Sequence, residues 1–259
     1  MSRAIGRGAS RGTLARAYER ALWIATLGRG FRAALPHGEV VRLAPACRDA
    51  SWNKPEYEAF RAATAPGAIV IDAGANVGVY SVLFAQWVGP GGHVFAFEPV
   101  GAIASVLRRQ LTLNGVADRV SVIESAIGAD PLRVTFTAPG LVGINRALAP
   151  GESVPDQVDV PAISLDAFCA ARRVRPSVIK IDIEGAELEA LRGARETIAA
   201  HRGLALFVEL HPSLWPRYGI DRADLELELA AQDLCAEPLR PEDDVWRVEG
   251  ICARLRRRT

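Results

Sequence analysis

The sequence predicts an α/β fold in which a mainly parallel sheet carries helices on both faces. Short apolar runs are each followed by a segment with helical periodicity, and the first of these junctions is a glycine-rich turn. Because neighbouring parallel strands need a long crossover, usually a helix, this alternation favours a parallel sheet over hairpins. The apolar runs that carry the pattern lie at 68–72, 93–97, 120–124, 178–182 and 204–210.

Length, charge and cysteine content limit the possible functions. A chain of 259 residues fits one domain with an added N-terminal segment. The formal net charge is +1, so no overall field points to nucleic acid as a partner. The four cysteines form no C-x-x-C pair, which favours free thiols and a cytoplasmic location. The longest apolar runs fall short of the ~20 residues of a membrane helix.

We divide the chain into a basic helical lead-in, residues 1–50, and a main domain, residues 51–259. Residues 1–32 are rich in arginine and hold a single acid, Glu19. Leu14, Tyr18, Leu22 and Trp23 fall on one helical face. Such a helix either packs on its own domain, which we expect, or lies on an anionic membrane surface.

The elements of the first half follow from periodicity and from turn residues. Residues 39–43 predict a short strand, and Pro55 suits the first turn of a helix over 54–64. Gly89-Pro90-Gly91-Gly92 and Asn114-Gly115 are helix-ending signals. The strands expected at 68–72, 93–97 and 120–124 therefore alternate with helices over 77–88 and 100–113.

The second half contains an insertion before the alternation returns. Residues 130–161 hold two β-like runs, 133–137 and 157–160, and predict a hairpin-like insertion with a mobile loop around 140–151. Further on we expect helices over 164–172, 186–201 and 222–232, with strands at 178–182 and 204–210. An antiparallel pair formed by 245–248 and 251–255 would close the sheet.

The turn after the first parallel strand points to a cofactor. Asp72 ends the strand, and Gly74, Asn76 and Gly78 follow it. Dinucleotide enzymes use G-x-G-x-x-G, whose second glycine makes room for a pyrophosphate, and Asn76 departs from that pattern. The turn suits a ligand with an amino-acid group and a sulfonium, such as S-adenosyl-L-methionine. A helix-capping aspartate is the simpler alternative for Asp72.

Two further strand ends complete the predicted cofactor site. Glu98 ends the second parallel strand, where acidic residues of nucleotide-binding sheets hold the ribose hydroxyls, and Pro99 turns the chain behind it. After the third strand, Ser125, Ala126 and Ile127 could form a shelf for an adenine ring.

The fourth and fifth parallel strands end in a second group of titratable residues. Lys180, Asp182 and Glu184 follow one strand, and Glu209 and His211 end the next. A histidine near its normal pKa could accept the proton of an acceptor hydroxyl at neutral pH. The same oxygen and nitrogen donors could also bind a divalent ion, so a metal is possible but is not predicted. In the simpler alternative, Lys180 neutralises one acid and Glu184 caps a helix.

These motifs together resemble the FkbM family of S-adenosylmethionine-dependent methyltransferases. The resemblance covers about residues 57–211 and rests on D-x-G-A-N-x-G and K-x-D-x-E-G, the segments running from Ile71 to Tyr80, from Phe97 to Pro99, from Ser164 to Asp166 and from Ile179 to Glu187. It implies a class I methyltransferase fold, Rossmann-like, with the last strand antiparallel.

The resemblance also implies methylation, mostly of hydroxyls, on a sugar, polysaccharide or secondary metabolite. Residues of the first two motifs then map to the cofactor site: Asp72, Gly74, Ala75, Asn76, Gly78, Tyr80, Glu98 and Pro99. Asp182 and Glu184 map to the cofactor and acceptor side of the pocket, and Asn145 and Arg146 are weaker acceptor candidates. A nicotinamide-dependent oxidoreductase and a non-catalytic nucleotide-binding module remain as alternatives.

Overall fold

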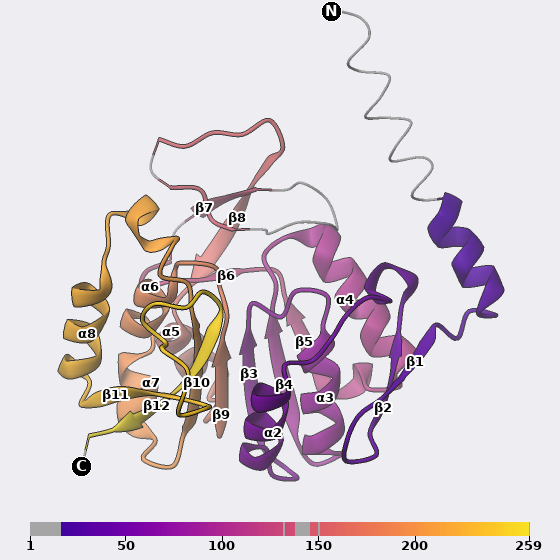
Figure 1. The fold of residues 1–259 in the computed structure, drawn as a ribbon, viewed down its shortest axis with the longest axis horizontal. Helices are drawn as coiled ribbons and strands as arrows, with labels where there is room; N and C mark the ends of the chain where they lie inside the picture. The colour runs from indigo at the N-terminus through magenta and orange to yellow at the C-terminus, as the bar shows by residue number, and fades with distance from the viewer. Residues whose placement is uncertain (1–16, 132, 138–145, 150, 259) are drawn as a thin grey trace, which may run out of the picture.

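A seven-stranded sheet forms the centre of the computed structural model, which describes residues 17–131, 133–137, 146–149 and 151–258 (Figure 1). Strand β12 is antiparallel to both of its neighbours, β10 and β11, whereas β10, β9, β3, β4 and β5 run parallel to one another. The predicted fold, including the antiparallel last strand, is therefore confirmed. The strand order is β11 (Leu234–Pro238), β12 (Ile251–Arg257), β10 (Ala205–Leu210), β9 (Val178–Ile181), β3 (Ile69–Ala73), β4 (His93–Phe97) and β5 (Val120–Ile123).

Helices cover both faces of this sheet because side chains alternate between the faces along each buried strand. Val70 packs in the core on one face, and Ile71 packs in the core on the other. The first core is covered by α2 (Lys54–Ala63), α3 (Val79–Val88) and α4 (Gly101–Leu113). The second is covered by α5 (Leu165–Arg172), α6 (Glu187–Arg192), α7 (Arg195–Ala200) and α8 (Arg222–Ala231).

The N-terminal part of the described chain is a helix followed by a hairpin. Strand β2 (Val40–Leu43) confirms the strand expected at 39–43, and it pairs with β1 (Phe31–Ala34), which was not predicted. In the helix over 17–25, Trp23 packs against the domain core, whereas Tyr18 is 56% exposed. Leu14 lies outside the described residues, and the division of the chain at residue 50 stays a prediction. Among the described helices, none combines the length and the apolar character needed to cross a bilayer.

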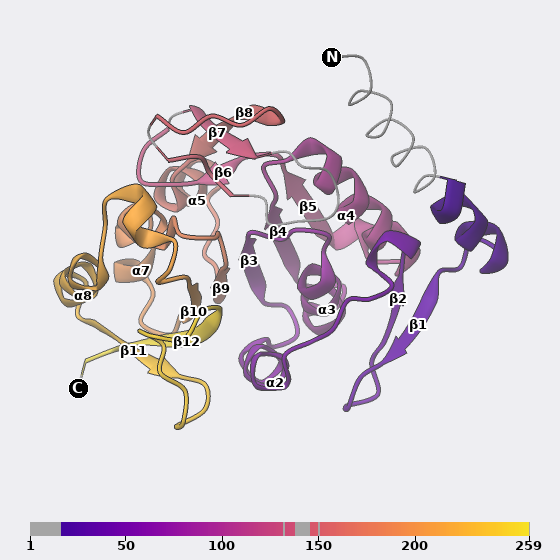
Figure 2. The ribbon, with the colours of Figure 1, turned by 45° about the horizontal axis from the view of Figure 1, so that its top comes forward.

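The predicted insertion forms a small sheet at the edge where the parallel strands end (Figures 1 and 2). Its strands are β6 (Ala126–Ile127), β7 (Arg133–Thr137) and β8 (Gln157–Ile163), in the order β6-β8-β7. Strands β7 and β8 are antiparallel, which confirms the hairpin-like insertion. Residues 138–145 and 150, which hold most of the expected loop, lie outside the described part. We call residues 128–161 the arm.

Two sequence predictions of the second half were wrong. Residues 245–248 form a turn in which the backbone amides of Arg247 and Val248 donate to the Asp244 carbonyl, so β12 pairs with β11 instead. The helix expected over 186–201 is divided into α6 and α7. The two carboxylate oxygens of Asp166 accept hydrogen bonds from the backbone amides of Glu196 and Thr197, which provides α7 with its own N-terminus.

Candidate active site

A cavity of about 350 Å³ lies between the carboxyl ends of β3, β4 and β9 and the arm. Open α/β sheets bind ligands at this edge. Seven of the predicted cofactor residues line the cavity: Gly74, Asn76, Glu98, Pro99, Ser125, Ala126 and Ile127. Asp182 and Glu184 line it as well, whereas Asp72, Ala75, Gly78, Tyr80, Lys180, Glu209 and His211 are outside its described walls.

Gly74 allows β3 and β9 to end in close contact. A Cβ atom at this position would lie 1.8 Å from the carbonyl oxygen of Asp182, and the φ of Gly74 is +80°. Asn76 also has a left-handed backbone, with φ 49°, which asparagine tolerates better than most residues. The turn thus requires a glycine at position 74 and favours an asparagine at position 76, and both residues face the cavity.

Glu98 is a buried acid in the cavity wall, and the residue as a whole is only 5% exposed. One of its carboxylate oxygens accepts a hydrogen bond of 2.9 Å from the backbone amide of Val100. Burial raises the pKa of Glu98 from 4.5 to about 7, although the backbone amides of Val100 and Asn76 act against this rise. Ribose hydroxyls donating to this carboxylate would add to these two backbone donors and would favour its charged form.

Asp72 is fully buried beside the cavity and is paired within the protein. Its Oδ2 accepts a hydrogen bond of 2.6 Å from Ser81 Oγ on α3, and its Oδ1 lies 3.6 Å from Lys180 Nζ. Asp72 and Lys180 are direct neighbours in the register of β3 and β9. Burial raises the pKa of Asp72, and the Lys180 cation and Ser81 oppose that rise. The structure places Asp72 in a buried ion pair rather than toward the loop amides of the turn.

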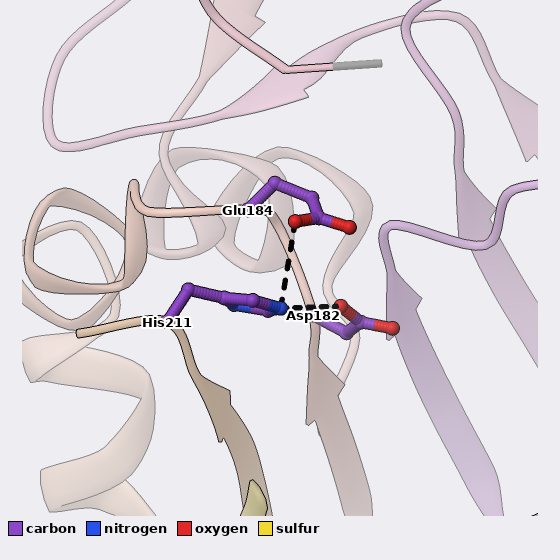
Figure 3. A group of neighbouring side chains, drawn as sticks. All are labelled: Asp182, Glu184 and His211. Atoms are coloured by element: carbon purple, nitrogen blue, oxygen red, sulfur yellow. Dashed lines mark ion pairs between the residues drawn. The ribbon is translucent and has the colours of Figure 1, made fainter. Parts of the chain in front are cut away.

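A histidine surrounded by carboxylates lies at the ends of β9 and β10 (Figure 3). Nε2 of His211 is 3.5 Å from Oε2 of Glu184, 3.6 Å from Oε1 of Glu209 and 3.9 Å from Oδ1 of Asp182. Asp182 also accepts a hydrogen bond of 3.1 Å from Lys180 Nζ, as its position two residues along the same strand predicts. The two acids that follow β9 are therefore brought together with Glu209 of β10 and with His211, which follows β10.

These carboxylates change the protonation of His211. Burial alone would lower the pKa of His211, but the nearby carboxylates of Glu187, Glu209 and Glu184 raise it to about 11. Burial likewise raises the pKa of Glu184 to about 7, against the charge of His211. The expectation of a histidine near its normal pKa was therefore wrong, because the sequence shows the acids without showing how closely they approach the ring.

Glu187 is the central residue of this group that we did not predict. It is fully buried, and its Oε1 lies 2.8 Å from Nδ1 of His211. The same carboxylate accepts hydrogen bonds from the backbone amide of Gly185 and from Trp215 Nε1. Glu187 ends the K-x-D-x-E-G-A-E stretch and could have been singled out only as one more acid in that stretch. Its contacts fix the ring of His211 with Nε2 toward Asp182 and Glu184.

A second unpredicted acid, Glu56 on α2, explains the position of Tyr80. The Tyr80 hydroxyl donates a hydrogen bond of 2.8 Å to Oε2 of Glu56, and the ring faces the Lys180 ammonium at 5.8 Å. Burial raises the pKa of Glu56 to about 7, while the bond from Tyr80 lowers it. Tyr80 thus packs between α2 and the sheet, beside the cavity rather than in its wall.

The arm and the 3-10 helix η3 (Trp215–Tyr218) form the far side of the cavity. The Tyr218 hydroxyl donates a hydrogen bond of 2.6 Å to the carbonyl oxygen of Ala147, and both residues line the cavity. Arg146, an acceptor candidate, is paired with Glu152 within the arm. Asn145, the other candidate, lies outside the described residues.

Comparison with known proteins gives a match over most of this region. The model of the methyltransferase FkbM domain matches residues 72–232. The chain is 29% identical over 161 residues to methyltransferase sdnD of Sordaria araneosa, covering 49% of this chain and 60% of that protein. It is 27% identical over 159 residues to the 31-O-demethyl-FK506 methyltransferase FkbM of Streptomyces tacrolimicus, covering 51% and 61%. The match thus spans about three fifths of these relatives.

Two solved structures are similar to this chain. A methyltransferase FkbM from Methylobacillus flagellatus KT aligns with a TM-score of 0.46 and 23% identity, covering 73% of this chain and 43% of that chain. A putative rRNA methylase from Clostridium thermocellum aligns with a TM-score of 0.50 and 12% identity, covering 80% and 99%. At that identity the second alignment supports the class I methyltransferase fold alone. The family match, which includes both the glycine turn and the acids after β9, shows that this chain belongs to the FkbM methyltransferase family.

Proposed function

We propose that this protein is an S-adenosyl-L-methionine-dependent methyltransferase that methylates a hydroxyl of a small molecule or glycan, such as a sugar, polysaccharide or secondary metabolite. The observation that carries the proposal is a single cavity wall that holds Asn76 and Glu98 as well as Asp182 and Glu184. The first pair would bind the adenosyl cofactor, and the second would meet the acceptor. From its free cysteines we also predict a cytoplasmic location.

The cofactor would lie along the ends of β3, β4 and β5. The Glu98 carboxylate would accept hydrogen bonds from the two ribose hydroxyls, and Ala126 and Ile127 would contact the adenine ring. The amino-acid end of the ligand would reach the Gly74–Asn76 turn, which lies against the backbone of Asp182. The sulfonium methyl group would then point toward the carboxylates after β9.

In the reaction, the acceptor oxygen would attack the methyl carbon in line while the carbon–sulfur bond breaks, and the acceptor would lose its proton. Orientation of two reactants can supply roughly 7–11 kcal/mol of the barrier, and a positioned base roughly 10²–10⁴ in rate. Asp182 and Glu184 face the cavity, whereas His211 lies behind them at 4% exposure. We therefore propose that the carboxylate of Asp182 receives the proton, with His211 as a positioning residue.

A thermal unfolding experiment tests the cofactor. S-adenosylmethionine or S-adenosylhomocysteine at ~100 times its dissociation constant adds about 2.7 kcal/mol, or roughly 5–10 °C in Tm for a chain of this size. We expect this shift in the wild type and a smaller one in Glu98→Gln, with the exposed Glu237→Gln as the matched control. A shift with NADH alone would instead support the oxidoreductase alternative.

Transfer of a labelled methyl group to sugar and polyketide acceptors tests the reaction. Methylation of a hydroxyl gives an ether that withstands mild alkali, whereas methylation of a carboxyl gives an ester that does not. Asp182→Ala and His211→Ala should lower turnover far more than they lower cofactor affinity. Near-normal turnover in both variants would contradict the roles given to these two residues.

A further inference from the structure

We propose that Asp182, Glu184 and His211 form a binding site for one divalent cation of the Mn²⁺ or Mg²⁺ class. Each of these three side chains offers one ligand atom, a carboxylate oxygen or an imidazole nitrogen, and the three atoms lie within 4.8 Å of one another. Oε1 of Glu209 is a fourth donor, 3.6 Å from the same nitrogen. Carboxylate oxygens with an imidazole nitrogen suit Mn²⁺ and related ions.

The spacing of the donor atoms fits a shared central ion better than direct pairing. The distances from His211 Nε2 to the three carboxylates, 3.5–3.9 Å, exceed the roughly 2.7–3.2 Å of an N–H···O hydrogen bond. Two donors that each lie ~2.1 Å from one octahedral ion are roughly 3.0 Å apart when adjacent and roughly 4.2 Å apart when opposite, and the observed distances fall between these two values. In Figure 3 the carboxylates of Asp182 and Glu184 face the same ring nitrogen.

The support behind His211 is an independent observation. Histidines that bind metals usually donate the other ring N–H to a carboxylate, which fixes the ring and leaves one nitrogen free. Glu187 provides this carboxylate at 2.8 Å from Nδ1, and it is fully buried with two other donors of its own. His211 is 4% exposed, so its Nε2 is a buried polar atom held toward the donor group.

The charge around the ring also favours a cation. Four carboxylates, those of Asp182, Glu184, Glu187 and Glu209, approach the His211 ring. Lys180 contacts Asp182 but is shared with Asp72. A divalent ion would balance the remaining charge. The side chains of Asp182 and Glu184 are 27% and 29% exposed on the cavity side, where an ion could also bind water or an acceptor oxygen.

Resting on the proposed function, the ion would bind the acceptor hydroxyl next to the sulfonium methyl and lower the pKa of that hydroxyl, and the proton would pass to the Asp182 carboxylate oxygen that does not bind the ion. The acceptor would then be a compound that offers an oxygen donor to a hard cation, such as a diol or a hydroxy acid. Ion binding itself requires neither cofactor nor acceptor, so it can be tested separately from methyl transfer.

Calorimetry of metal-free protein with MnCl₂, repeated with MgCl₂, tests the site directly. We expect one Mn²⁺ per chain in the wild type and affinity lowered about tenfold or more in Asp182→Asn and in His211→Gln. Glu189→Gln is the matched control, because Glu189 lines the same cavity but is paired with Arg192. This variant should bind Mn²⁺ as the wild type does.

A spectroscopic measurement identifies the ligand. Electron spin echo spectra of the bound Mn²⁺ should show coupling to a histidine nitrogen, and this coupling should disappear in His211→Gln. Circular dichroism of each variant verifies folding, and Glu184→Gln provides a second variant if one fails to fold. Binding of no Mn²⁺ at millimolar concentration, or equal affinity in all variants, would overturn the metal site. A Tm shift with S-adenosylmethionine in that case would leave the proposed function intact.

Discussion

Two acidic sites at the same edge of the sheet differ in how well their charge is balanced. The first group is Asp72 with its partners, and the second is Asp182 and Glu184 with theirs. Asp72, near the end of β3, is fully buried, and its carboxylate is paired with the Lys180 cation on β9 and the Ser81 hydroxyl on α3. Asp182 and Glu184 after β9 face the cavity and share one imidazole with Glu209. Both positions are acidic strand ends, yet the first is paired internally and the second has more acids than cations.

From this difference we infer a structural role for Asp72 and a ligand-binding role for Asp182 and Glu184. A buried carboxylate with partners from two elements fixes those elements relative to each other, and loss of one partner leaves an uncompensated charge. A cluster of carboxylates with too few cations repels itself, and only the surrounding fold keeps its members close together. Such groups are typical of functional sites, where the missing partner is a substrate, a proton or an ion.

Removing the cation of the first group should have the largest effect. Lys180→Met leaves Asp72 buried without its counter-charge, and breaking a buried pair costs about 3–5 kcal/mol. We expect the free energy of unfolding in urea to fall by this amount. Arg256→Met, which removes an exposed partner of Glu237, should change it by less than about 1 kcal/mol. A similarly small change in Lys180→Met would mean that the first group is not structural.

Glu187→Gln tests the second group while its other acids and His211 stay in place. The glutamine keeps the size of the side chain but weakens its hold on Nδ1 of His211. Methyl transfer should fall about 10- to 100-fold, with the Tm shift caused by S-adenosylhomocysteine unchanged. Glu228→Gln, a change in another buried acid that is paired with Arg195 on the helical face, should leave turnover unchanged.

The ribose-binding role proposed for Glu98 predicts that cofactor binding depends on pH. With a pKa of about 7 in the folded protein, Glu98 is protonated at pH 6 and becomes a hydrogen-bond acceptor for both ribose hydroxyls above pH 7. Affinity for S-adenosylhomocysteine should therefore rise about tenfold from pH 6 to pH 8, since a bond to a charged group adds about 1.5–3 kcal/mol. Titration calorimetry at several pH values checks this.

The raised pKa of Glu98 should also affect stability, but in the opposite direction to affinity. Because the folded pKa of Glu98 is raised, the free protein loses stability through this group as pH rises from about 4.5 to about 7. In Glu98→Gln the pH dependence of affinity should be absent, and the loss of stability over this range should be smaller but not zero, because the raised pKa values of Glu56 and Glu184 act in the same direction. A wild-type affinity that is constant over this range would exclude Glu98 as the ribose acceptor.

The smallest effect concerns the backbone of Glu184. Its φ of 55° is left-handed, a conformation that costs a side-chain-bearing residue roughly 1–2 kcal/mol. Glu184→Gly and Glu184→Ala both remove the carboxylate, so their difference reports the backbone alone. We expect the glycine variant to be more stable by about 1 kcal/mol in urea. Equal stabilities would show that the turn relaxes when the carboxylate is removed.

The local parts of the fold and site could be predicted from the sequence, because they depend on neighbouring residues. The strand ending at Asp72, the turn through Gly74 and the acid at Glu98 are short-range patterns, and the structure confirms the fold they imply. Strand β11 was missed because the segment 239–250 separates it from its partner β12. The strand predicted within that segment, at 245–248, is a turn that begins at Asp244.

Side-chain partners between elements could not be predicted in the same way. The contact of Asp72 with Ser81 depends on how α3 packs on β3, and that of Glu187 with His211 joins the start of α6 to the end of β10. Each acid has several possible partners in sequence, and only the packing of the elements selects one. For this reason the sequence predicted which residues the structure brings together at the sheet edge, but it did not predict the protonation of His211.

The base of the arm has a practical consequence for protein engineering. Strand β6 pairs in parallel with the end of β8, and Ser125 Oγ donates a hydrogen bond of 3.0 Å to the carbonyl oxygen of Pro161. The chain therefore leaves and re-enters the domain at one clamped point. We expect an arm of different length or composition to be accepted between residues 128 and 161 with the seven-stranded scaffold left intact, and under the proposed function such exchanges between homologues would show whether the arm selects the acceptor.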